Sequence, residues 1–429
     1  MSVYRNPDFR RLPSGLAGLF DRAAADSFFT LPAWYDLMAR CGVPPRSDIR
    51  VYTDERPGSA MALLLRSTAP EAGRCLTSLA NAYSVEHGII AGPDADLDAG
   101  FEAILSEIQS ERPRRVGLRL TELDPLDPSY RTAVQSLRRA GFLVGCAFDS
   151  GTWYEDTAAL SFAEYVAARP PELRNTWRRK QRRVYRSNRL SKAFFANATR
   201  IDQAIADYQT VYAASWKPAE FFPEFIPALI RLAAELGALR LGIYYIDGVP
   251  AAAQFWILWH GRAVIYKLAH DKRLDDLSLG TLLTMEMTER VLGDDRPREI
   301  TLGRGDDPYK KLWLSKRRER WGINAANPRT WRGLGLGLKR KAGKLYHRLR
   351  GEPIFLSGDP GRNDLGRQTF NRDTPGYLNQ RIPTTPFRFA GQKRLMRRGC
   401  ERVRLRTREA AERPIDHDSG VCRLVQACS

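Results

Sequence analysis

The spacing of apolar residues divides the first 330 residues of the chain into helices and strands. Apolar residues three and four positions apart predict helices at 31–40, 100–110, 129–142, 201–216, 223–238 and 279–293. Shorter apolar runs predict strands at 48–54, 59–68, 114–123, 239–246, 249–260, 263–270 and 298–303, and a strand pair within 142–156. Asp247 and Gly248 favour a tight turn after 239–246, so the three strands between 239 and 270 are expected to form an antiparallel meander.

This order of elements predicts a mixed α/β (α+β) fold with two halves. Residues 1–160 form the first half and 196–330 the second, each with a mostly antiparallel central sheet flanked by helices. Residues 161–195 bridge them, 331–350 are basic and leucine-bearing, and 351–429 lack periodicity and are expected to be disordered. With 429 residues, 43% of them hydrophobic, the chain can bury cores of this size.

The bridging segment is strongly basic. Pro170 and Pro171 favour a helix start, because proline is tolerated in the first helical turn. We expect a solvated basic helix whose Trp177 and Val184 face the core. The alternative is that some of its cations contact an anionic ligand, and the residues that would do so are Arg174, Arg178, Arg179, Lys180, Arg182, Arg183 and Arg186.

Charge and cysteine content restrict the class of protein. Most of the net charge of +19 lies in residues 331–429, which carry 22 Lys/Arg and 9 Asp/Glu, so it says little about the two halves. The six cysteines show no CxxC spacing and the five histidines are scattered, so we expect neither a metal site nor a disulfide framework. The N-terminus lacks the apolar stretch of a secretory signal, and the best apolar run, 249–259, is shorter than the roughly 20 residues of a membrane helix. We expect a cytoplasmic protein.

The stretch "ITLGRGDDPYKKLWLS" at 300–315 joins a strand end to two glycines, two acids and paired lysines. A P-loop needs a glycine directly before its lysine, but Lys310 follows Tyr309. A dinucleotide-binding fingerprint needs a third glycine where Pro308 stands. Both nucleotide-binding motifs are therefore excluded.

Residues 266–283 ("YKLAHDKRLDDLSLGTLL") and 300–313 resemble a GNAT-superfamily acyltransferase of the CelD/BcsL type (BioF2-like acetyltransferase domain), which is associated with cellulose and other exopolysaccharide synthesis. "AASWK" at 213–217 and "LANAYS" at 79–84 resemble family stretches too. The family is distantly related to the FemAB-type transferases that build peptidoglycan cross-bridges. The resemblance implies two tandem GNAT-like units, the first of which is a scaffold that shapes the acceptor groove.

The chain keeps most of the family pattern and departs from it at two positions. An acid is common where Thr301 stands, so we assign no catalytic role there, and a proline is common at Leu279. The positions that match are Tyr266, Lys267, Asp271, Ser278, Gly280, Gly303, Gly305, Asp306, Tyr309, Lys310 and Trp313.

The resemblance implies that acyl-CoA, with acetyl-CoA as the first choice, binds where two strands part. Its pyrophosphate would dock at the start of helix 279–293, because the free N–H groups of a helix start bind anions. Ser278 would cap this helix and Gly280 would let the phosphates come close. The residues expected to contact acyl-CoA are Gln254, Lys267, Ser278, Leu279, Gly280, Thr281, Gly303 and Gly305.

Four residues are expected to carry the chemistry. Tyr309 would protonate the departing thiolate, and Lys310 would pair with a phosphate or the developing oxyanion. Asp271 or Asp306 would accept a proton from the attacking amine or hydroxyl. The structural alternatives are a core tyrosine for Tyr309, a solvated lysine for Lys310 and a helix cap for Asp306.

The expected activity is transfer of an acyl group to nitrogen or oxygen of a glycan, sugar or related acceptor. Direct attack in a ternary complex is favoured, because no cysteine falls in the stretches that would form the cleft. A FemAB-like aminoacyl-tRNA-dependent transferase is the alternative, although nucleic acid is the less favoured partner. A third, non-catalytic hypothesis is an adaptor bound through 331–350 to the anionic inner face of the membrane.

Overall fold

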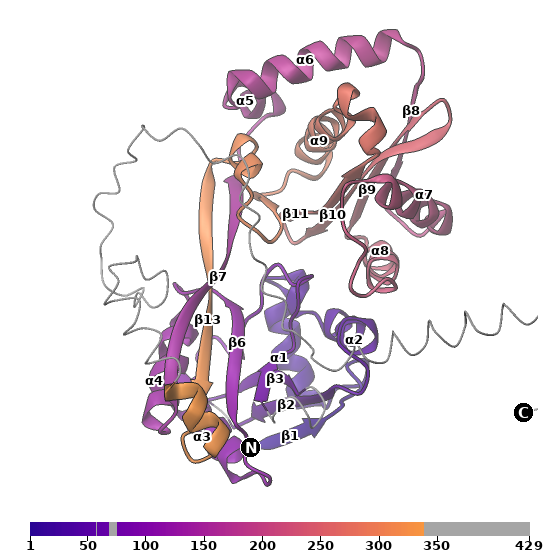
Figure 1. The fold of residues 1–429 in the computed structure, drawn as a ribbon. Coiled ribbons are helices and arrows are strands. Elements are labelled where there is room, and N and C mark those ends of the chain that lie inside the picture. The colour runs from indigo at the N-terminus through magenta and orange to yellow at the C-terminus, as the bar shows by residue number, and fades with distance from the viewer. Residues whose placement is uncertain (57, 68–74, 339–429) are drawn as a thin grey trace, which may run out of the picture. The chain divides into compact units, whose positions relative to one another are not determined.

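The computed structural model describes residues 1–56, 58–67 and 75–338 (Figure 1). Its helices are α1 (Ser14–Ala24), α2 (Pro32–Cys41), α3 (Leu97–Ser110), α4 (Pro128–Arg139), α5 (Phe162–Ala167), α6 (Pro171–Arg186), α7 (Ile201–Ala214), α8 (Phe225–Glu235) and α9 (Leu279–Arg290). Short helical segments are η1 (Phe28–Thr30), η3 (Lys272–Leu277), η4 (Val291–Asp295) and η5 (Pro308–Leu312). The strands are β1 (Ser2–Arg5), β2 (Asp48–Asp54), β3 (Met61–Ser67), β4 (Cys75–Ser78), β5 (Ile90–Ala91), β6 (Gly117–Leu123), β7 (Leu143–Asp156), β8 (Leu190–Phe195), β9 (Leu239–Ile246), β10 (Val249–Trp259), β11 (Arg262–His270), β12 (Glu299–Leu302) and β13 (Lys316–Ala326).

The strands of the described residues form one sheet. Their order is β1-β2-β3-β4-β6-β13-β7-β12-β11-β10-β9-β8, with β5 beside β3. Two neighbouring pairs, β4–β6 and β11–β12, are parallel. Parallel neighbours need a crossover connection, and here α3 and α9 supply it. The two halves therefore repeat one arrangement of strand, helix and parallel strand, and the expected mixed fold with a helix-flanked central sheet is confirmed.

Strand β13 joins the two halves. It follows the second half in sequence, but it pairs with β6 on one side and with β7 on the other. β7 pairs in turn with β12. Figure 1 shows β7 and β13 running side by side. The two sheets expected from the sequence are thus continuous, and all the described residues fall within one compact unit.

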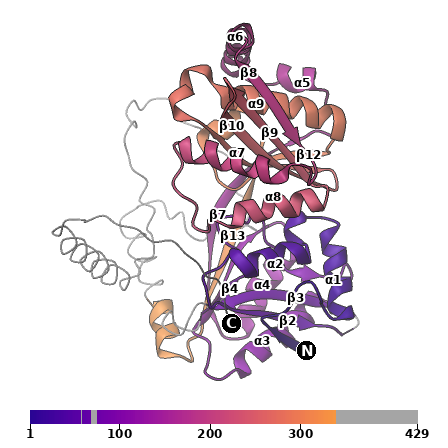
Figure 2. The ribbon, with the colours of Figure 1, turned by 90° about the vertical axis from the view of Figure 1, so that its right-hand side faces the viewer.

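Helices cover both faces of the sheet. In β10, Phe255 and Ile257 belong to the core beneath α7 and α8, whereas Ala252 and Trp256 belong to the core beneath α9. This alternation is the normal consequence of a strand whose successive side chains point to opposite faces. Figure 2 shows α7 and α8 in front of the strands of the second half. In the first half α1 and α2 cover one face, and α3 and α4 the other.

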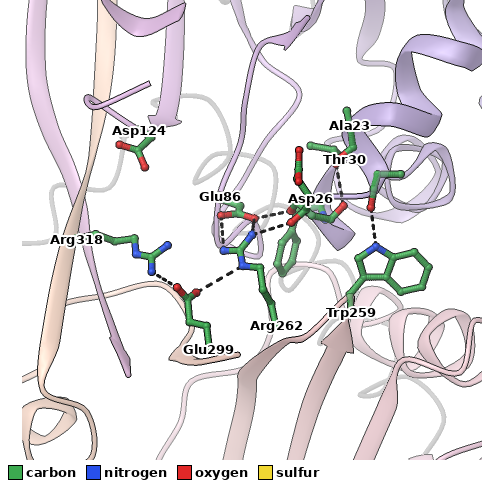
Figure 3. Close-up of polar contacts among 12 residues, drawn as sticks. Ala23, Asp26, Thr30, Glu86, Asp124, Trp259, Arg262, Glu299 and Arg318 are labelled. Carbon is green, nitrogen blue, oxygen red and sulfur yellow. Dashed lines mark hydrogen bonds and ion pairs between the residues drawn. The ribbon is translucent and has the colours of Figure 1, made fainter. Parts of the chain in front are cut away.

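A chain of ion pairs connects the two halves beside the start of β11 (Figure 3). Arg262 donates hydrogen bonds of 3.0 and 3.1 Å to Glu86 and lies 3.5 Å from Glu299. Glu86 also accepts a bond of 3.0 Å from Arg320 of β13. Glu299 pairs on its other side with Arg318. Charges this well buried are stable only while each has its partner.

Every helix expected from the apolar spacing is present, but some strands differ from the prediction. Within residues 142–156 a single strand, β7 (Leu143–Asp156), forms instead of a strand pair. The bridging segment contains α5, α6 and also β8, the outermost strand of the second half. As expected, α6 begins at Pro171, buries Val184 and packs Trp177 against the core.

The C-terminal predictions fall mostly beyond the described part of the chain. Residues 331–338 are helical, whereas the rest of the basic segment 331–350 and the tail 351–429 lie outside the described residues. Among the helices that the structure describes, none has both the length and the apolar character needed to cross a bilayer.

Candidate active site

Strands β11 and β12 pair over three residues and then part. The pairs are Arg262–Glu299, Ala263–Ile300 and Val264–Thr301. The next residues, Ile265 and Leu302, line a cavity of about 190 Å³. At this point Tyr266 is an extra residue in β11, because Phe255 and Trp256 of β10 pair with Lys267 and Ile265 on either side of it. Such a bulge bends the strand and locally increases its twist, which accounts for the divergence of β11 from β12.

Both halves of the molecule line this cavity. Its walls come from β11, from β12 and the following turn, from the loop between α7 and α8, and from a loop of the first half. The lining residues are Ala82, Tyr83, Val85, Lys217, Ile265, Tyr266, Lys267, Leu268, Leu302, Gly303, Arg304, Asp307, Tyr309 and Lys310. Pockets that enclose drug-sized ligands hold roughly 300–1,000 Å³. The cavity is smaller, so it suits the reacting ends of two substrates.

The turn after β12 depends on its two glycines. Gly303 and Gly305 have φ values of 31° and 111°, which side-chain-bearing residues rarely adopt. A Cβ atom on Gly303 would also lie 3.2 Å from the carbonyl oxygen of Ile265 on β11. The expectation that these glycines let the chain bend sharply is therefore met, and Gly303 lines the cavity.

Lys310 holds this turn in place. It is 4% exposed, and its ammonium donates to the carbonyl oxygens of Leu302 (3.2 Å), Arg304 (2.8 Å) and Gly305 (3.0 Å). These bonds use all three donors of a lysine. Burial lowers the pKa of Lys310, an effect that Asp307 at 3.3 Å opposes. We therefore correct the expected role of Lys310, because an ammonium engaged in this way supports the turn and is not free to bind a phosphate or an oxyanion.

Tyr309 and Asp307 face the cavity from the same turn. The side chain of Asp307 is 58% exposed and Tyr309 is 42% exposed. Burial of the ring, with a smaller contribution from Asp307, raises the pKa of Tyr309 to about 12. The hydroxyl therefore stays protonated at neutral pH and can donate a proton, as the sequence-based assignment requires.

The two predicted carboxylates lie elsewhere. Asp306 accepts hydrogen bonds from Arg317 at 2.6 Å and from Trp153 Nε1 at 2.8 Å, and Arg317 lowers the pKa of Asp306. Asp271 accepts from the backbone and side chain of Arg273, which lowers the pKa of Asp271. Neither is among the residues that line the cavity. The expectation that one of them accepts the acceptor's proton is corrected, because both are held by arginine and are weakly basic.

The strand residues Gln254 and Lys267 point in different directions. Gln254 is 1% exposed, bonds to Thr284 of α9 and accepts from Trp256 Nε1 at 2.8 Å. It belongs to the core beneath α9, so the expected contact with acyl-CoA is corrected. Lys267 lines the cavity and forms an ion pair of 2.8 Å with Glu220.

The start of α9 provides unpaired backbone N–H groups. Its first backbone hydrogen bond runs from Leu282 N–H to Ser278 C=O at 3.1 Å. The N–H groups of Leu279, Gly280 and Thr281 precede that bond and have no acceptor within the helix. Ser278 adopts a φ of 54° and its side chain makes no capping bond, so the expected cap is corrected.

A side chain already occupies the space beside Gly280. A Cβ atom on Gly280 would lie 3.1 Å from Nδ1 of His270. The His270 ring is 2.7 Å from Asp275 through Nε2, and its centroid is 4.6 Å from that of Trp216. Close approach at Gly280 is therefore explained within the protein by His270, and a phosphate docked here would meet this imidazole.

The sequence-based prediction missed several residues of the cavity. Tyr83, from the first half, accepts from the Tyr266 hydroxyl at 2.6 Å through its carbonyl and donates to Glu220 at 2.7 Å. Lys217 lies in the loop that joins α7 and α8. Both lie in stretches noted for family resemblance, "LANAYS" and "AASWK", so that resemblance was the signal that could have found them.

Metal ligation finds no support in this part of the molecule. Among the residues described, no group of three or more His, Cys, Asp or Glu side chains could hold a metal ion.

Comparison with known proteins assigns the second half of the chain. Residues 171–311 match the family described as Acetyltransferase (GNAT) domain. Comparison with curated proteins gave no match. Similar solved structures include FemX (9% identity, 75% of this chain and 97% of that one, TM-score 0.49) and L-PGS from Bacillus licheniformis (10%, 77% and 96%, 0.44). A tandem GNAT protein from the clavulanic acid biosynthesis pathway is also similar (14%, 71% and 97%, 0.40).

The domain match and the geometry concern the same elements. Residues 171–311 span α6 to the turn after β12, and they include the parted strands and the start of α9. These residues match a GNAT acetyltransferase domain, so this part of the chain is an acyltransferase domain of the GNAT type.

Proposed function

We propose that the chain transfers an acyl group from acyl-CoA, with acetyl-CoA as the first choice, to an amine or hydroxyl of a glycan, a sugar or a related acceptor. The observation that carries the proposal is the divergence of β11 and β12 at a cavity, close in sequence to a helix start with free N–H groups. The cavity would hold the thioester and the helix start the pyrophosphate. The glycan acceptor and a role in polysaccharide synthesis rest on the CelD/BcsL resemblance.

The residues of the cavity suggest how transfer would proceed. Direct attack of the acceptor on the thioester needs a proton acceptor for the nucleophile and a proton donor for the leaving thiolate. Asp307 would accept the proton in place of Asp306, because its carboxylate faces the cavity. Tyr309 would donate one to the thiolate. The loop around Tyr83 would complete the acceptor side, which supports the scaffold role proposed for the first half.

A negative charge introduced at the start of α9 tests whether the pyrophosphate of the donor binds there. Thr281→Glu places a carboxylate beside the proposed pyrophosphate position, whereas Thr281→Gln has nearly the same shape without the charge. We expect Thr281→Glu to weaken acetyl-CoA binding by about tenfold or more, as repulsion of about 1.4 kcal/mol would do, and Thr281→Gln to bind nearly as wild type. Isothermal titration calorimetry measures both.

A control at the other end of the helix makes this test specific. A Cβ atom added to Gly293 would have no neighbour within 4 Å, and Gly293 lies beyond the last residue of α9, so Gly293→Glu adds the same charge away from the helix start. Equal affinity of Thr281→Glu and Gly293→Glu for acetyl-CoA would contradict the proposed donor site. Wild-type protein that binds no acetyl-CoA and releases no thiol with amino-sugar or sugar acceptors would contradict the function itself.

One feature favours the second candidate, an aminoacyl-tRNA-dependent transferase. Helix α6 packs on α9, and Arg183 pairs with Asp276 near the start of α9. Its outward face exposes arginines spaced three and four residues apart, which would suit a phosphate backbone. These residues are Arg178, Arg179, Arg182, Arg183 and Arg186.

Salt dependence separates the two donors. If tRNA is the donor, its binding should weaken steeply with salt. Arg178→Glu with Arg182→Glu should then reduce the slope of log K against log salt by about 0.7–0.9 for each phosphate that these arginines neutralise in the wild type. Arg11→Glu with Arg22→Glu, two exposed arginines of the first half, serves as the control. Filter binding without measurable affinity for tRNA at low salt would remove this candidate.

A further inference from the structure

Lys217 is a cation without an anionic partner beside the cavity. Within the described residues no carboxylate lies within ion-pair distance of its ammonium, which is 5.8 Å from the centroid of the Trp216 ring. The other cations of the cavity are neutralised. Their partners are Glu220 for Lys267 (2.8 Å), Glu122 for Arg304 (2.6 Å) and Asp307 for Lys310 (3.3 Å).

The surroundings of Lys217 disfavour its positive charge. Burial, and then the charges of Lys267 and Lys310, lower the pKa of Lys217 to about 8, while Glu220 and Asp307 oppose this. A partly buried cation among other cations is stabilised when an anion comes close to it. The cavity therefore lacks one negative charge, at Lys217.

The position of Lys217 indicates which substrate would bring that charge. Lys217 lies in the loop between α7 and α8. The neighbouring Trp216 packs on His270 beside Gly280, but Lys217 itself lines the cavity, to which the residues at the start of α9 do not contribute. The phosphates of the donor are assigned to the start of α9. An anion at Lys217 would consequently belong to the acceptor, which would reach the cavity from the side of α7 and α8.

We propose that Lys217 recognises a carboxylate or phosphate group on the acceptor, so the acyltransferase acts on an anionic amine or hydroxyl compound. This inference rests on the proposed function and narrows its acceptor class. An aromatic ring of the same loop lies near the ammonium: the centroid of Trp216 is 5.8 Å away, and this side chain is 54% exposed. Exposed aromatic surface beside a cation suits a ligand that joins an anionic group to a ring or another apolar part.

Protection of Lys217 from acylation tests the subsite in the full chain. Trace labelling with an amine-acetylating reagent is measured by mass spectrometry in chloride, inorganic phosphate or succinate at matched ionic strength. We expect phosphate or succinate to reduce labelling of Lys217 several-fold, because an ion-paired ammonium is a poor nucleophile. Labelling of the exposed Lys311, which does not line the cavity, should stay constant. Protection by phosphate alone or by succinate alone identifies the anionic group, and protection by neither overturns the proposal.

Substitutions separate anion recognition from proton transfer by Lys217. Lys217→Met keeps the apolar stem and removes the charge, whereas Lys217→Arg keeps the charge. We expect Lys217→Met to lose about tenfold or more in calorimetric affinity for the protecting anion, Lys217→Arg to stay within a few-fold, and the control Lys311→Met to match wild type. Unchanged anion affinity in Lys217→Met contradicts the proposal. Loss of turnover in Lys217→Arg with intact anion affinity would instead indicate a proton acceptor and would also overturn it.

Binding of acetyl-CoA keeps this test distinct from that of the proposed function. Lys217 lines the cavity, whereas the residues at the start of α9 do not, so the Met variant should bind acetyl-CoA as wild type does. Wild-type protein that fails to bind acetyl-CoA, while Lys217 is still protected by an anion, refutes the donor and leaves the anionic subsite. Wild-type protein that binds acetyl-CoA, while no anion protects Lys217, refutes the anionic subsite and leaves acetyl-CoA as the donor.

Discussion

At the scale of single residues, the adjacent acids Asp306 and Asp307 each have a cationic partner, at 2.6 Å from Arg317 and 3.3 Å from Lys310, but only Asp307 faces the cavity. Arg317 and Trp153 bind Asp306, whereas the Asp307 carboxylate lines the cavity. We expect Asp307→Asn to lower kcat by on the order of 10²-fold with normal folding, because an amide cannot accept a proton. Asp306→Asn should instead lower thermal stability, by about 1 kcal/mol for a partly exposed charge-assisted bond, with little effect on turnover. Thiol-release kinetics and thermal melts of both variants distinguish the two roles. The opposite pattern would show that Asp306 is the proton acceptor.

The Tyr309 hydroxyl offers a second test at this scale. Since its pKa is about 12, the proton donor is present across neutral and mildly alkaline pH and is lost only as pH rises towards 12. Tyr309→Phe should lower kcat by about 10²-fold and leave acetyl-CoA affinity unchanged, because only the proton donor is removed. The wild-type rate should show no alkaline decline due to Tyr309 below about pH 10. A fall in affinity with unchanged kcat would show that Tyr309 binds substrate instead.

The residues that the sequence could and could not assign differ in where their partners lie. Tyr309, Gly303 and Lys267 were assigned to the site from the family resemblance and do line the cavity. Asp306 was misassigned because its partner Arg317 lies on β13, which only tertiary pairing brings beside β7. Lys310 was misassigned because its ammonium binds backbone carbonyl groups of its own turn. These groups are the same in every residue, so the side chains in the sequence do not reveal this contact.

At the scale of elements, periodicity found the helices but not every strand. The apolar faces of α2, α7 and α8 have helical spacing, so local sequence sufficed. Strand β13, "KRRERWGINAA", begins with five charged residues and was not predicted. Its place is fixed by pairing with β6 and β7, which are distant in sequence. The divergence of β11 and β12 was likewise expected only from family resemblance, because the register of strand pairing and a β-bulge determine where the two strands separate.

Substitution of Gly303 tests how strongly the geometry of β11 and β12 depends on the turn after β12. It combines a φ of 31° with a neighbouring carbonyl, whereas Gly248 has a φ of 78° and open space. Gly248→Ala should cost about 1 kcal/mol of unfolding free energy for the backbone conformation alone. Gly303→Ala should cost more, because its Cβ also crowds β11, and should weaken acetyl-CoA binding. Urea denaturation and calorimetry measure both, with Gly145→Ala in β7, which has neither constraint, as the reference. Equal losses at 303 and 248 would show that crowding against β11 is unimportant.

At the scale of the whole molecule, the continuous sheet makes the two halves depend on each other. The cavity needs Tyr83 from the first half and β11 from the second. Beside the start of β11, Glu86 from the first half is bound by Arg262 and Arg320 from the second. Burial alone would raise the pKa of Glu86, but these two arginines lower it to about 2. The ionised carboxylate is thus part of what holds the halves together.

Acid should therefore loosen this connection in a defined range. The unfolded pKa of Glu86 is about 4.5 and the folded one about 2, so the unfolded chain takes up the proton first as pH falls. The contribution of Glu86 is fully present above about pH 4.5 and declines as pH falls towards about 2. Glu86→Gln should lower the unfolding free energy at neutral pH by about 3 kcal/mol or more, because two buried arginines lose their anion, and should flatten its decline below pH 4.5. Urea denaturation from neutral pH to about pH 3.5 measures the difference, with the exposed Glu235→Gln as the control. If Glu86→Gln keeps the pH slope of wild type, the junction does not depend on this charge, and the continuous sheet alone holds the halves together.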